Sequence, residues 1–418
     1  MRPEILAPVG SMEALNAALA AGCDAVYFGL PSFGARAFAN NFNLETTKEV
    51  IERCHLCGVK VYITMNTILY EDEIEDAYQM AKKVHSFGVD ALIIQDLGFI
   101  HLLHHRLPNL VLHASTQLSI SNPHQIEQLK KLGVQRVVLA RECTKEEIQA
   151  CVNTGIEVEV FVHGALCICY SGQCYFSSVH YGRSGNRGMC AQPCRMKYSL
   201  YEDGNKLETD GEYLLSPKDL SLMDEVNTLA DMGVCSLKIE GRMKSAPYVY
   251  ESVSQVKKVL DHLDRNMLDE QNLRVTFNRE YTLGHMYKAC GKSLMNSKTS
   301  NHQGIEIGKV TKVKKNKICI QLSQNLHQND GIRFEQENLG CNVNFMYDKK
   351  QNLISFMPKN NTVMIEGPIG IHVGSKVRKT MDSELNKTID EKIRTSRRQS
   401  KVHAIVTCEE VGQPMCME

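Results

Sequence analysis

One pattern of hydrophobic and polar positions recurs from residue 1 to about residue 264. Apolar residues spaced for one face of a helix, such as Val50, Ile51 and Cys54, are followed by a glycine and then by a short apolar run. A glycine at that place favours the left-handed turn that ends a helix, so we expect the apolar run after it to form a strand. The pattern predicts eight strands, at residues 4–7, 25–28, 59–63, 91–94, 110–113, 134–139, 156–162 and 234–239.

The alternation of strands and helices predicts an α/β fold. Parallel strands need crossover helices, and eight such units favour closure into a (β/α)8 barrel of the TIM type, which takes about 250 residues. An open, doubly wound sheet is the alternative, and it is disfavoured because no Gly-x-Gly-x-x-Gly motif follows the first strand. We therefore expect a barrel over residues 1–264.

The connection after the seventh strand interrupts this rhythm. It runs over residues 164–216, and we expect a helix to begin near Asp219. Long connections at the carboxyl ends of barrel strands commonly carry function. After the barrel we expect a connector at 265–303, and short β-rich runs between turn residues predict a small β-barrel module at 304–380. Residues 381–418 predict a polar helix and the start of a further, truncated domain.

Charge balance and hydropathy narrow the class of partner. Acidic and basic residues number 48 each, so no overall field gathers nucleic acid or anionic lipid, and any polyanion site has to be local. No apolar run approaches the roughly 18 residues needed to cross a bilayer, and the first residues lack the layout of a signal peptide. We expect a cytoplasmic protein without membrane or DNA partners.

Sixteen cysteines are many for a reducing compartment, where clustered thiols usually serve metals or redox chemistry. Four thiolates in a loop with glycine and serine suit an iron–sulfur cluster. A structural zinc site is the competing interpretation, although it usually has two short cysteine pairs, and unligated thiols are a third. The four cysteines of the long connection are Cys167, Cys174, Cys190 and Cys194, with six, fifteen and three residues between them.

The residues around these cysteines resemble the signature of the collagenase-like peptidase family U32. That signature has the form Glu-x-Phe-x-x-Gly-Ala-x-Cys-x4-Gly-x-Cys-x-x-Ser. The resemblance extends to residues 4–10, 34–36, 238–242 and 277–279, so it spans most of the first 280 residues. The positions that match the signature are Glu159, Phe161, Gly164, Ala165, Cys167, Gly172, Cys174 and Ser177.

The resemblance implies a cofactor and a reaction. Family members carry a 4Fe-4S cluster on the C-x6-C-x15-C-x3-C pattern, which implies that Cys167, Cys174, Cys190 and Cys194 are its ligands. Several members make 5-hydroxypyrimidines in RNA without molecular oxygen, with prephenate implicated as the oxygen source. The β-module is similar to that of the longer members, which implies 5-hydroxycytidine in large-subunit ribosomal RNA, with transfer RNA as the second candidate substrate.

The family's name implies a peptidase instead. A peptidase needs an activated nucleophile or a metal-bound water, and the sequence contains neither His-Glu-x-x-His nor Gly-x-Ser-x-Gly. His163 with Cys167 could form a Cys/His pair, although a histidine that lines the barrel mouth is the simpler interpretation. A third hypothesis is a non-catalytic RNA-binding scaffold in which the cluster is structural.

Polar residues after the barrel strands are the candidate catalytic residues, because the carboxyl ends of the strands form the active face of such a barrel. Prephenate is a dicarboxylate, so the hydroxylase hypothesis requires an arginine clamp, for which Arg36, Arg141 and Arg242 are the candidates. The full set is Arg36, Asn66, Gln117, Arg141, His163, Glu240 and Arg242.

Basic and aromatic residues fill the long connection, and residues 164–200 contain no Asp or Glu. Such a segment suits phosphate contact and base stacking, whereas an ordinary exposed loop is the alternative. The candidate RNA contacts are Arg183, Arg187, Arg195 and Lys197, and the aromatic residues of the segment include Tyr170, Tyr175, Phe176 and Tyr181. Five lysines at 309–317 form either a solvated hairpin or a second RNA contact.

Overall fold

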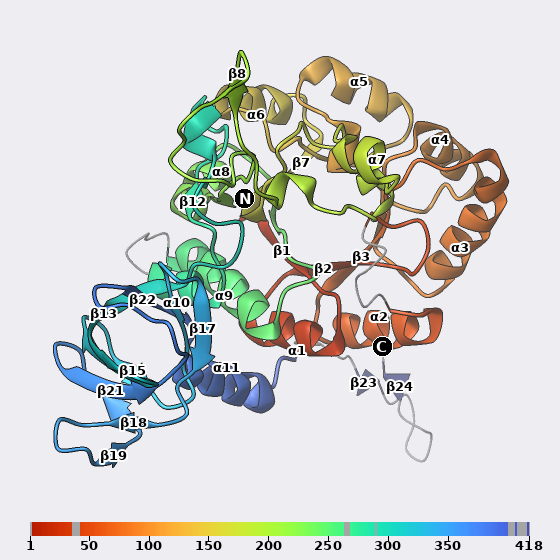
Figure 1. The fold of residues 1–418 in the computed structure, drawn as a ribbon. Helices are drawn as coiled ribbons and strands as arrows, with labels where there is room; N and C mark the ends of the chain where they lie inside the picture. Colours follow the sequence, from red (N-terminus) through yellow and green to blue (C-terminus); the bar gives the residue numbers. More distant parts are fainter. Residues whose placement is uncertain are drawn as a thin grey trace.

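The computed structural model describes residues 2–35, 42–262, 268–288, 291–399, 406–407 and 416–417. Within these residues, eight parallel strands pair in sequence order, and β11 pairs with both β1 and β7. The sheet therefore closes on itself, and the predicted TIM-type barrel is confirmed (Figure 1). Its strands are β1 (Glu4–Pro8), β2 (Ala25–Gly29), β3 (Lys60–Met65), β4 (Ala91–Ile94), β5 (Leu112–Ala114), β6 (Arg136–Val138), β7 (Glu157–Ala165) and β11 (Ser236–Ile239).

Helices connect these strands and cover the outside of the barrel (Figure 1). Local sequence fixes their ends: the Ser11 side chain accepts a hydrogen bond from the Ala14 amide at the start of α1, and Gly22 follows its last residue with φ +90°. The predicted capping box of Thr144 and Glu147 begins α6. The barrel helices are α1 (Met12–Ala21), α2 (Leu44–Leu56), α3 (Ile74–Ser86), α4 (Leu97–Arg106), α5 (Pro123–Lys131), α6 (Lys145–Val152), α8 (Val226–Asp231) and α9 (Ala246–His262).

The barrel interior holds an ion-paired network. Arg136 on β6 donates to Glu4 at 2.7 Å and to Glu159 at 3.3 Å. Lys238 on β11 lies 2.7 Å from the other oxygen of Glu159, and the Tyr62 hydroxyl donates to Glu4 at 2.7 Å. Buried charges are tolerated only when they are paired and hydrogen-bonded, so this network compensates each charge inside the barrel.

The connection between β7 and β11 contains a strand where the sequence predicts a helix. The prediction of a helix near Asp219 is wrong, because β10 (Asp219–Ser221) runs antiparallel to the end of β7, and α8 begins only at Val226. The Asp219 carboxylate accepts a hydrogen bond from the Arg279 amide at 3.0 Å and so ties β10 to β12 (Tyr281–Thr282). The rest of the connection contains α7 (Phe176–Tyr181) and a short hairpin of β8 (Tyr201–Glu202) and β9 (Asn205–Lys206).

A second sheet with its own hydrophobic core follows the barrel and α10 (Glu270–Thr276). It is antiparallel, forms a half-barrel, and stands beside the α9 side of the barrel (Figure 1). In spatial order its strands are β17 (Leu339–Asn342), β16 (Gly331–Phe334), β22 (Lys376–Met381), β13 (Ile305–Lys314), β14 (Lys317–Leu322), β21 (Thr362–Glu366), β18 (Met346–Tyr347) and β19 (Leu353–Ile354).

The chain then returns to the barrel. Helix α11 (Ser383–Thr395) contacts α1 and α9, and Arg398 donates to the carbonyl oxygen of Cys57 at 3.2 Å. A short pair of strands, β23 (Val406–Thr407) and β24 (Cys416–Met417), lies after it. Among the residues that the structure describes, none of the helices has the length and apolar composition to cross a membrane.

Candidate active site at the barrel mouth

The carboxyl ends of the barrel strands carry the predicted catalytic residues. Asn66 follows β3, Arg141 lies three residues after the end of β6, and His163 lies near the end of β7. Glu240 follows β11 directly. Arg36, the remaining arginine of the predicted clamp beside Arg141 and Arg242, lies outside the described residues.

Arg141 and Glu240 face each other across the mouth. Nη2 of Arg141 lies 3.6 Å from a carboxylate oxygen of Glu240, and Nη1 donates to the carbonyl oxygen of Ala165 at 3.0 Å. The guanidinium also lies 4.2 Å from the centroid of the Phe161 ring. Nε of Arg141 is buried and has no hydrogen-bond partner in the described part of the chain. One N–H of this fixed cation is therefore available to an acceptor on a ligand.

Arg242, Asn66 and Gln117 connect neighbouring loops of the mouth. The nearly buried Arg242 donates from Nη1 to the Thr64 hydroxyl at 2.9 Å. The Asn66 side chain accepts from the Ala35 amide at 3.1 Å, and Gln117 donates to the Asn66 carbonyl oxygen at 2.9 Å. These contacts hold the Asn66 and Gln117 side chains against neighbouring segments at the mouth.

Two glycines of the signature let the cysteine-bearing segment approach the barrel closely. Gly164 has φ +118°, and a Cβ there would lie 2.7 Å from the Glu240 side chain. Gly172 has φ +77°, and a Cβ there would lie 2.1 Å from the Gln117 carbonyl oxygen. Any larger residue would displace the segment from the mouth, which explains both glycines physically.

His163 is buried among aromatic rings. Its ring stacks on Tyr248 with centroids 5.7 Å apart and meets Tyr281 edge to face at 5.4 Å. Burial, with the nearby Lys244 charge adding to it, lowers the pKa of His163 from 6.5 to about 3. His163 is therefore a neutral imidazole and a weak base near pH 7.

Lys244 is absent from the predicted set although it lies beside these residues. Its ammonium nitrogen lies 2.8 Å from the centroid of the Phe277 ring and 5.8 Å from that of Tyr248. Burial lowers its pKa from 10.5 to about 7, with Arg279 adding to this effect and Asp219 opposing it. Glu240 follows the eighth barrel strand, and Lys244 lies four residues after Glu240. This position near a strand end could have identified Lys244 as a candidate site residue.

Arg279 and Asp219 complete the charge cluster next to Lys244. Nε of Arg279 lies 3.6 Å from Oδ1 of Asp219, and both side chains are nearly buried. Neither atom has a hydrogen-bond partner within the described residues. Unsatisfied buried polar atoms commonly mark a place where a ligand or water binds.

The four cysteine candidates interact with one another. Burial raises the pKa of Cys194 to about 11; the Arg195 charge opposes this, and Cys167, Cys190 and Cys174 add to it. Burial also raises the pKa of Cys174. The sulfur of Cys190 accepts a hydrogen bond from the Gln192 amide at 3.3 Å. The four cysteines therefore lie near enough for their charges to influence one another.

No group of three or more His, Cys, Asp or Glu in the described chain is arranged to bind one metal ion. Within these residues, the four cysteines of the insertion are therefore not arranged as the ligands of a single ion.

Arg187 and Arg195, two of the predicted RNA contacts, hold the insertion in place. Arg187 forms a close ion pair with Glu73 and donates from Nη1 to the Ile68 carbonyl oxygen at 2.7 Å. Arg195 is largely buried and donates to the Leu166 carbonyl oxygen at 3.1 Å. The Arg187 guanidinium thus ties the insertion to the segment before α3, whereas Arg195 holds the two ends of the insertion together.

The other two predicted RNA contacts are exposed. Arg183 donates to the Met189 carbonyl oxygen at 3.1 Å, and Lys197 lies 2.6 Å from a Glu212 carboxylate. Exposed aromatic rings accompany them on the insertion, which suits base stacking. These rings belong to Tyr170, Tyr175, Tyr181 and Tyr201.

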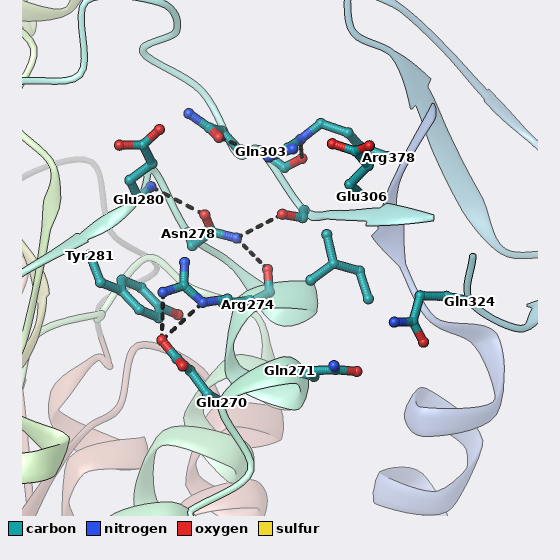
Figure 2. Close-up of a pocket in the computed structure, with 12 residues that line it drawn as sticks. Glu270, Gln271, Arg274, Asn278, Glu280, Tyr281, Gln303, Glu306, Gln324 and Arg378 are labelled. Carbon is teal, nitrogen blue, oxygen red and sulfur yellow. Dashed lines mark hydrogen bonds and ion pairs between the residues drawn. The ribbon is translucent and has the colours of Figure 1, made fainter. Parts of the chain in front are cut away.

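A cleft of about 650 Å³ lies between α10 and the half-barrel. Figure 2 shows that Arg274 pairs with Glu270, and that Asn278 bridges to neighbouring backbone. Tyr281 lines this cleft, and its ring also contacts that of His163. Each charged residue that lines the cleft already has an ion-pair partner, which makes the mouth the stronger candidate site.

The fold and the site define a class of TIM-barrel proteins with a cysteine-bearing insertion at the mouth. Comparison with protein families agrees: residues 10–296 match the model of "Peptidase family U32". The chain belongs to peptidase family U32.

Some curated relatives are named for RNA hydroxylation, and one is named collagenase. The chain is 34% identical to the 23S rRNA 5-hydroxycytidine C2501 synthase of Escherichia coli over 85% of this chain and 56% of that protein. It is 40% identical to tRNA hydroxylation protein P1 of Bacillus subtilis over 62% of this chain and 63% of that protein. It is also 34% identical to the collagenase of Porphyromonas gingivalis over 68% of this chain and 73% of that protein. The chain thus spans less than two thirds of the first two relatives.

Proposed function

We propose that this protein hydroxylates RNA and forms a 5-hydroxypyrimidine. We propose 5-hydroxycytidine in large-subunit ribosomal RNA as the product, a 4Fe-4S cluster as the cofactor and prephenate as the oxygen donor. The observation that carries the proposal is the close approach of a segment with four cysteines to a barrel mouth that holds Arg141 with an unsatisfied N–H. Relatives named as rRNA and tRNA hydroxylation proteins support it.

The cluster would be held by Cys167, Cys174, Cys190 and Cys194. When bound it supplies either electron transfer or substrate positioning at the mouth. The Gln192 amide already donates to the sulfur of Cys190, as backbone N–H groups do around thiolate ligands. Arg195, beside Cys194, offsets the negative charge of the thiolates.

A dicarboxylate co-substrate would meet several cations at the mouth. Arg141 offers a buried N–H that has no partner in the described chain, and Arg279 offers a second. Lys244 lies beside them over the Phe277 ring. These side chains would bind and orient an anion, and the buried ring of Tyr248 would help to exclude water from the site.

The peptidase alternative is weakened by the environment of His163. A Cys/His nucleophile pair requires an imidazole that accepts the thiol proton. Burial lowers the pKa of His163 to about 3, and its ring packs between Tyr248 and Tyr281. Peptidase activity remains the second candidate function because one relative is named collagenase.

Mass spectrometry of ribosomal and transfer RNA tests the proposal. Deletion of the gene should remove one hydroxylated pyrimidine, the intact gene should restore it, and Cys190→Ala should not. Cys169→Ala, in the same loop, is the matched control and should restore the nucleoside. An unchanged nucleoside profile in the deletion strain contradicts the proposal, and peptide cleavage by the anaerobically purified Cys190→Ala protein would favour the peptidase.

A further inference from the structure

Five lysines project from one hairpin of the half-barrel. The hairpin consists of β13 and β14, and residues 307–329 contain no Asp or Glu. In the described part of the chain, no carboxylate lies within ion-pairing distance of any of these ammonium groups, which makes them a local excess of positive charge. The exposed lysines are Lys309, Lys312, Lys314, Lys315 and Lys317.

Several lysines on the surface of the barrel helices and of α11 are paired with carboxylates. Lys48 lies 3.7 Å from Glu52, and Lys387 lies 2.6 Å from Glu384. Such pairs are the ordinary way in which a neutral protein distributes its surface charge. The hairpin differs from these pairs because its five lysines lie together in a segment without Asp or Glu, although the chain as a whole has equal numbers of acidic and basic residues.

A bulge in β13 turns Lys312 outward. The register against β14 shifts between Val310 and Lys312, so Thr311 is the extra residue. Val310 is buried on the core side, and strict alternation would place Lys312 on that side as well. With the extra residue, Lys309, Lys312 and Lys314 are all exposed.

The same face places like charges opposite each other. Lys314 is the direct cross-strand partner of Lys317. Lys309 is the direct cross-strand partner of Lys376 on β22. The Lys376 ammonium lies 3.1 Å from the Glu306 carboxylate. Like charges directly opposite in a sheet are destabilising, so this arrangement does not serve the stability of the half-barrel. An anionic partner would offset the repulsion.

One acidic residue does stand opposite this face. Glu366 on β21 is the cross-strand partner of Lys317. Its carboxylate accepts a hydrogen bond from the Tyr347 hydroxyl at 3.1 Å, and the Lys317 ammonium lies 5.7 Å from the Tyr347 ring centroid. A single carboxylate held in this way does not neutralise the five lysines.

We propose that the outer face of the β13–β14 hairpin binds the phosphodiester backbone of RNA. This inference rests on the proposed function, because it takes RNA to be the substrate, and it adds a contact outside the barrel mouth. Ammonium groups on flexible stems bind phosphates as point charges and do not read bases. The hairpin should therefore contribute affinity and salt dependence without sequence preference.

A salt titration of RNA binding tests the proposal with the full chain. The probe is a fluorescent polyuridine of about 20 nucleotides, long enough to cover such a surface. The variant carries Lys309→Gln, Lys312→Gln, Lys314→Gln and Lys317→Gln. For single-stranded RNA, each lost phosphate contact should reduce the slope of log affinity against log salt by about 0.7, so the slope should fall by as much as about 3.

A matched variant controls for net charge. Lys48→Gln, Lys130→Gln, Lys257→Gln and Lys387→Gln remove the same charge from lysines that are paired on helices, and the slope should stay near that of the wild type. Replacement of the four hairpin lysines by arginine should preserve the slope. The Gln variant should melt no earlier than the wild type, because it removes like-charge repulsion.

Three outcomes would overturn the proposal: equal slope losses in the two Gln variants, no slope change in either, or saturable binding of polyglutamate in place of polyuridine, which would indicate an acidic protein partner. A failure of the proposed hydroxylase function can be distinguished from a failure of this binding proposal. The former appears as an unchanged nucleoside profile in the deletion strain, whereas polyuridine binding needs no chemistry at the mouth.

Discussion

The ammonium of Lys238 lies 2.7 Å from the carboxylate of Glu159 inside the barrel, and both side chains are almost completely buried. Glu159 opens the family signature, yet it does not line the mouth. It also lies 3.3 Å from Arg136, so one carboxylate compensates two buried cations. The signature therefore begins with a residue that balances charge in the barrel interior.

Glu159→Gln should destabilise the protein strongly. Removing one partner of a buried ion pair leaves an uncompensated charge and costs about 3–5 kcal/mol in the free energy of unfolding. Glu157→Gln is the control, because Glu157 bonds the same Arg136 from the surface, with its side chain 54% exposed, and its loss should cost at most about 1 kcal/mol. Urea denaturation measures both values, and equal costs would contradict the assigned role of Glu159.

The barrel could be predicted from the sequence because its determinants are local. Helix-ending glycines and apolar runs recur at each unit, and Ser11 and Thr144 cap their helices within three residues. The prediction of a helix near Asp219 was wrong because a contact distant in the sequence decides the structure there. The partner that holds Asp219 in a strand is Arg279, 60 residues further along the chain.

The candidate site could be predicted only in part for the same reason. The strand ends identified Arg141 and Glu240, which the structure places 3.6 Å apart. Lys244 owes its low pKa to burial against Phe277, a residue beyond the barrel. The carboxylate that fixes Arg187 comes from Glu73, at the start of α3, and no spacing in the sequence indicates that pair.

Iron and sulfide content should distinguish Cys169 from the four proposed ligands. Cys174→Ser should abolish the iron, the labile sulfide and the visible absorbance of anaerobically purified protein, because a cluster of this type needs four thiolates. Cys169→Ser should retain them, since the Cys169 sulfur donates to the Gln173 carbonyl oxygen at 3.3 Å. Loss of iron in both variants, or in neither, would contradict this assignment.

Acid should destabilise the protein through buried His163. Its pKa is about 3 in the folded protein and near 6.5 in an unfolded chain, so below pH 6.5 the unfolded state binds a proton that the folded state does not. Stability should therefore fall as pH decreases from about 6.5 towards 3, by as much as about 1.4 kcal/mol per pH unit. His163→Phe should remove this contribution to the pH dependence of the free energy of unfolding. His124→Phe, at an exposed position, should leave this pH dependence unchanged. The same pH dependence of stability in both variants would argue against the assigned contribution of His163.

Lys244 should react as an amine at neutral pH. Because burial lowers its pKa to about 7, half of the Lys244 side chains carry no proton near pH 7 and can attack an acylating reagent. The groups that face Lys244 are Arg279, Asp219, Glu240, Arg195 and His163. Brief labelling at a series of pH values, followed by peptide mass spectrometry, should give a midpoint near pH 7 for the Lys244 peptide.

The charges around Lys244 set the direction of two further changes. Arg279→Gln removes a neighbouring cation, so the midpoint of Lys244 labelling should move to higher pH. Asp219→Asn removes the carboxylate that opposes the shift, so the midpoint should move to lower pH. Lys244→Arg should abolish the labelled peptide and so confirm its identity. If the midpoint stays near 10.5 in the wild type, the ammonium is solvated and the packing of Lys244 against Phe277 does not persist in solution.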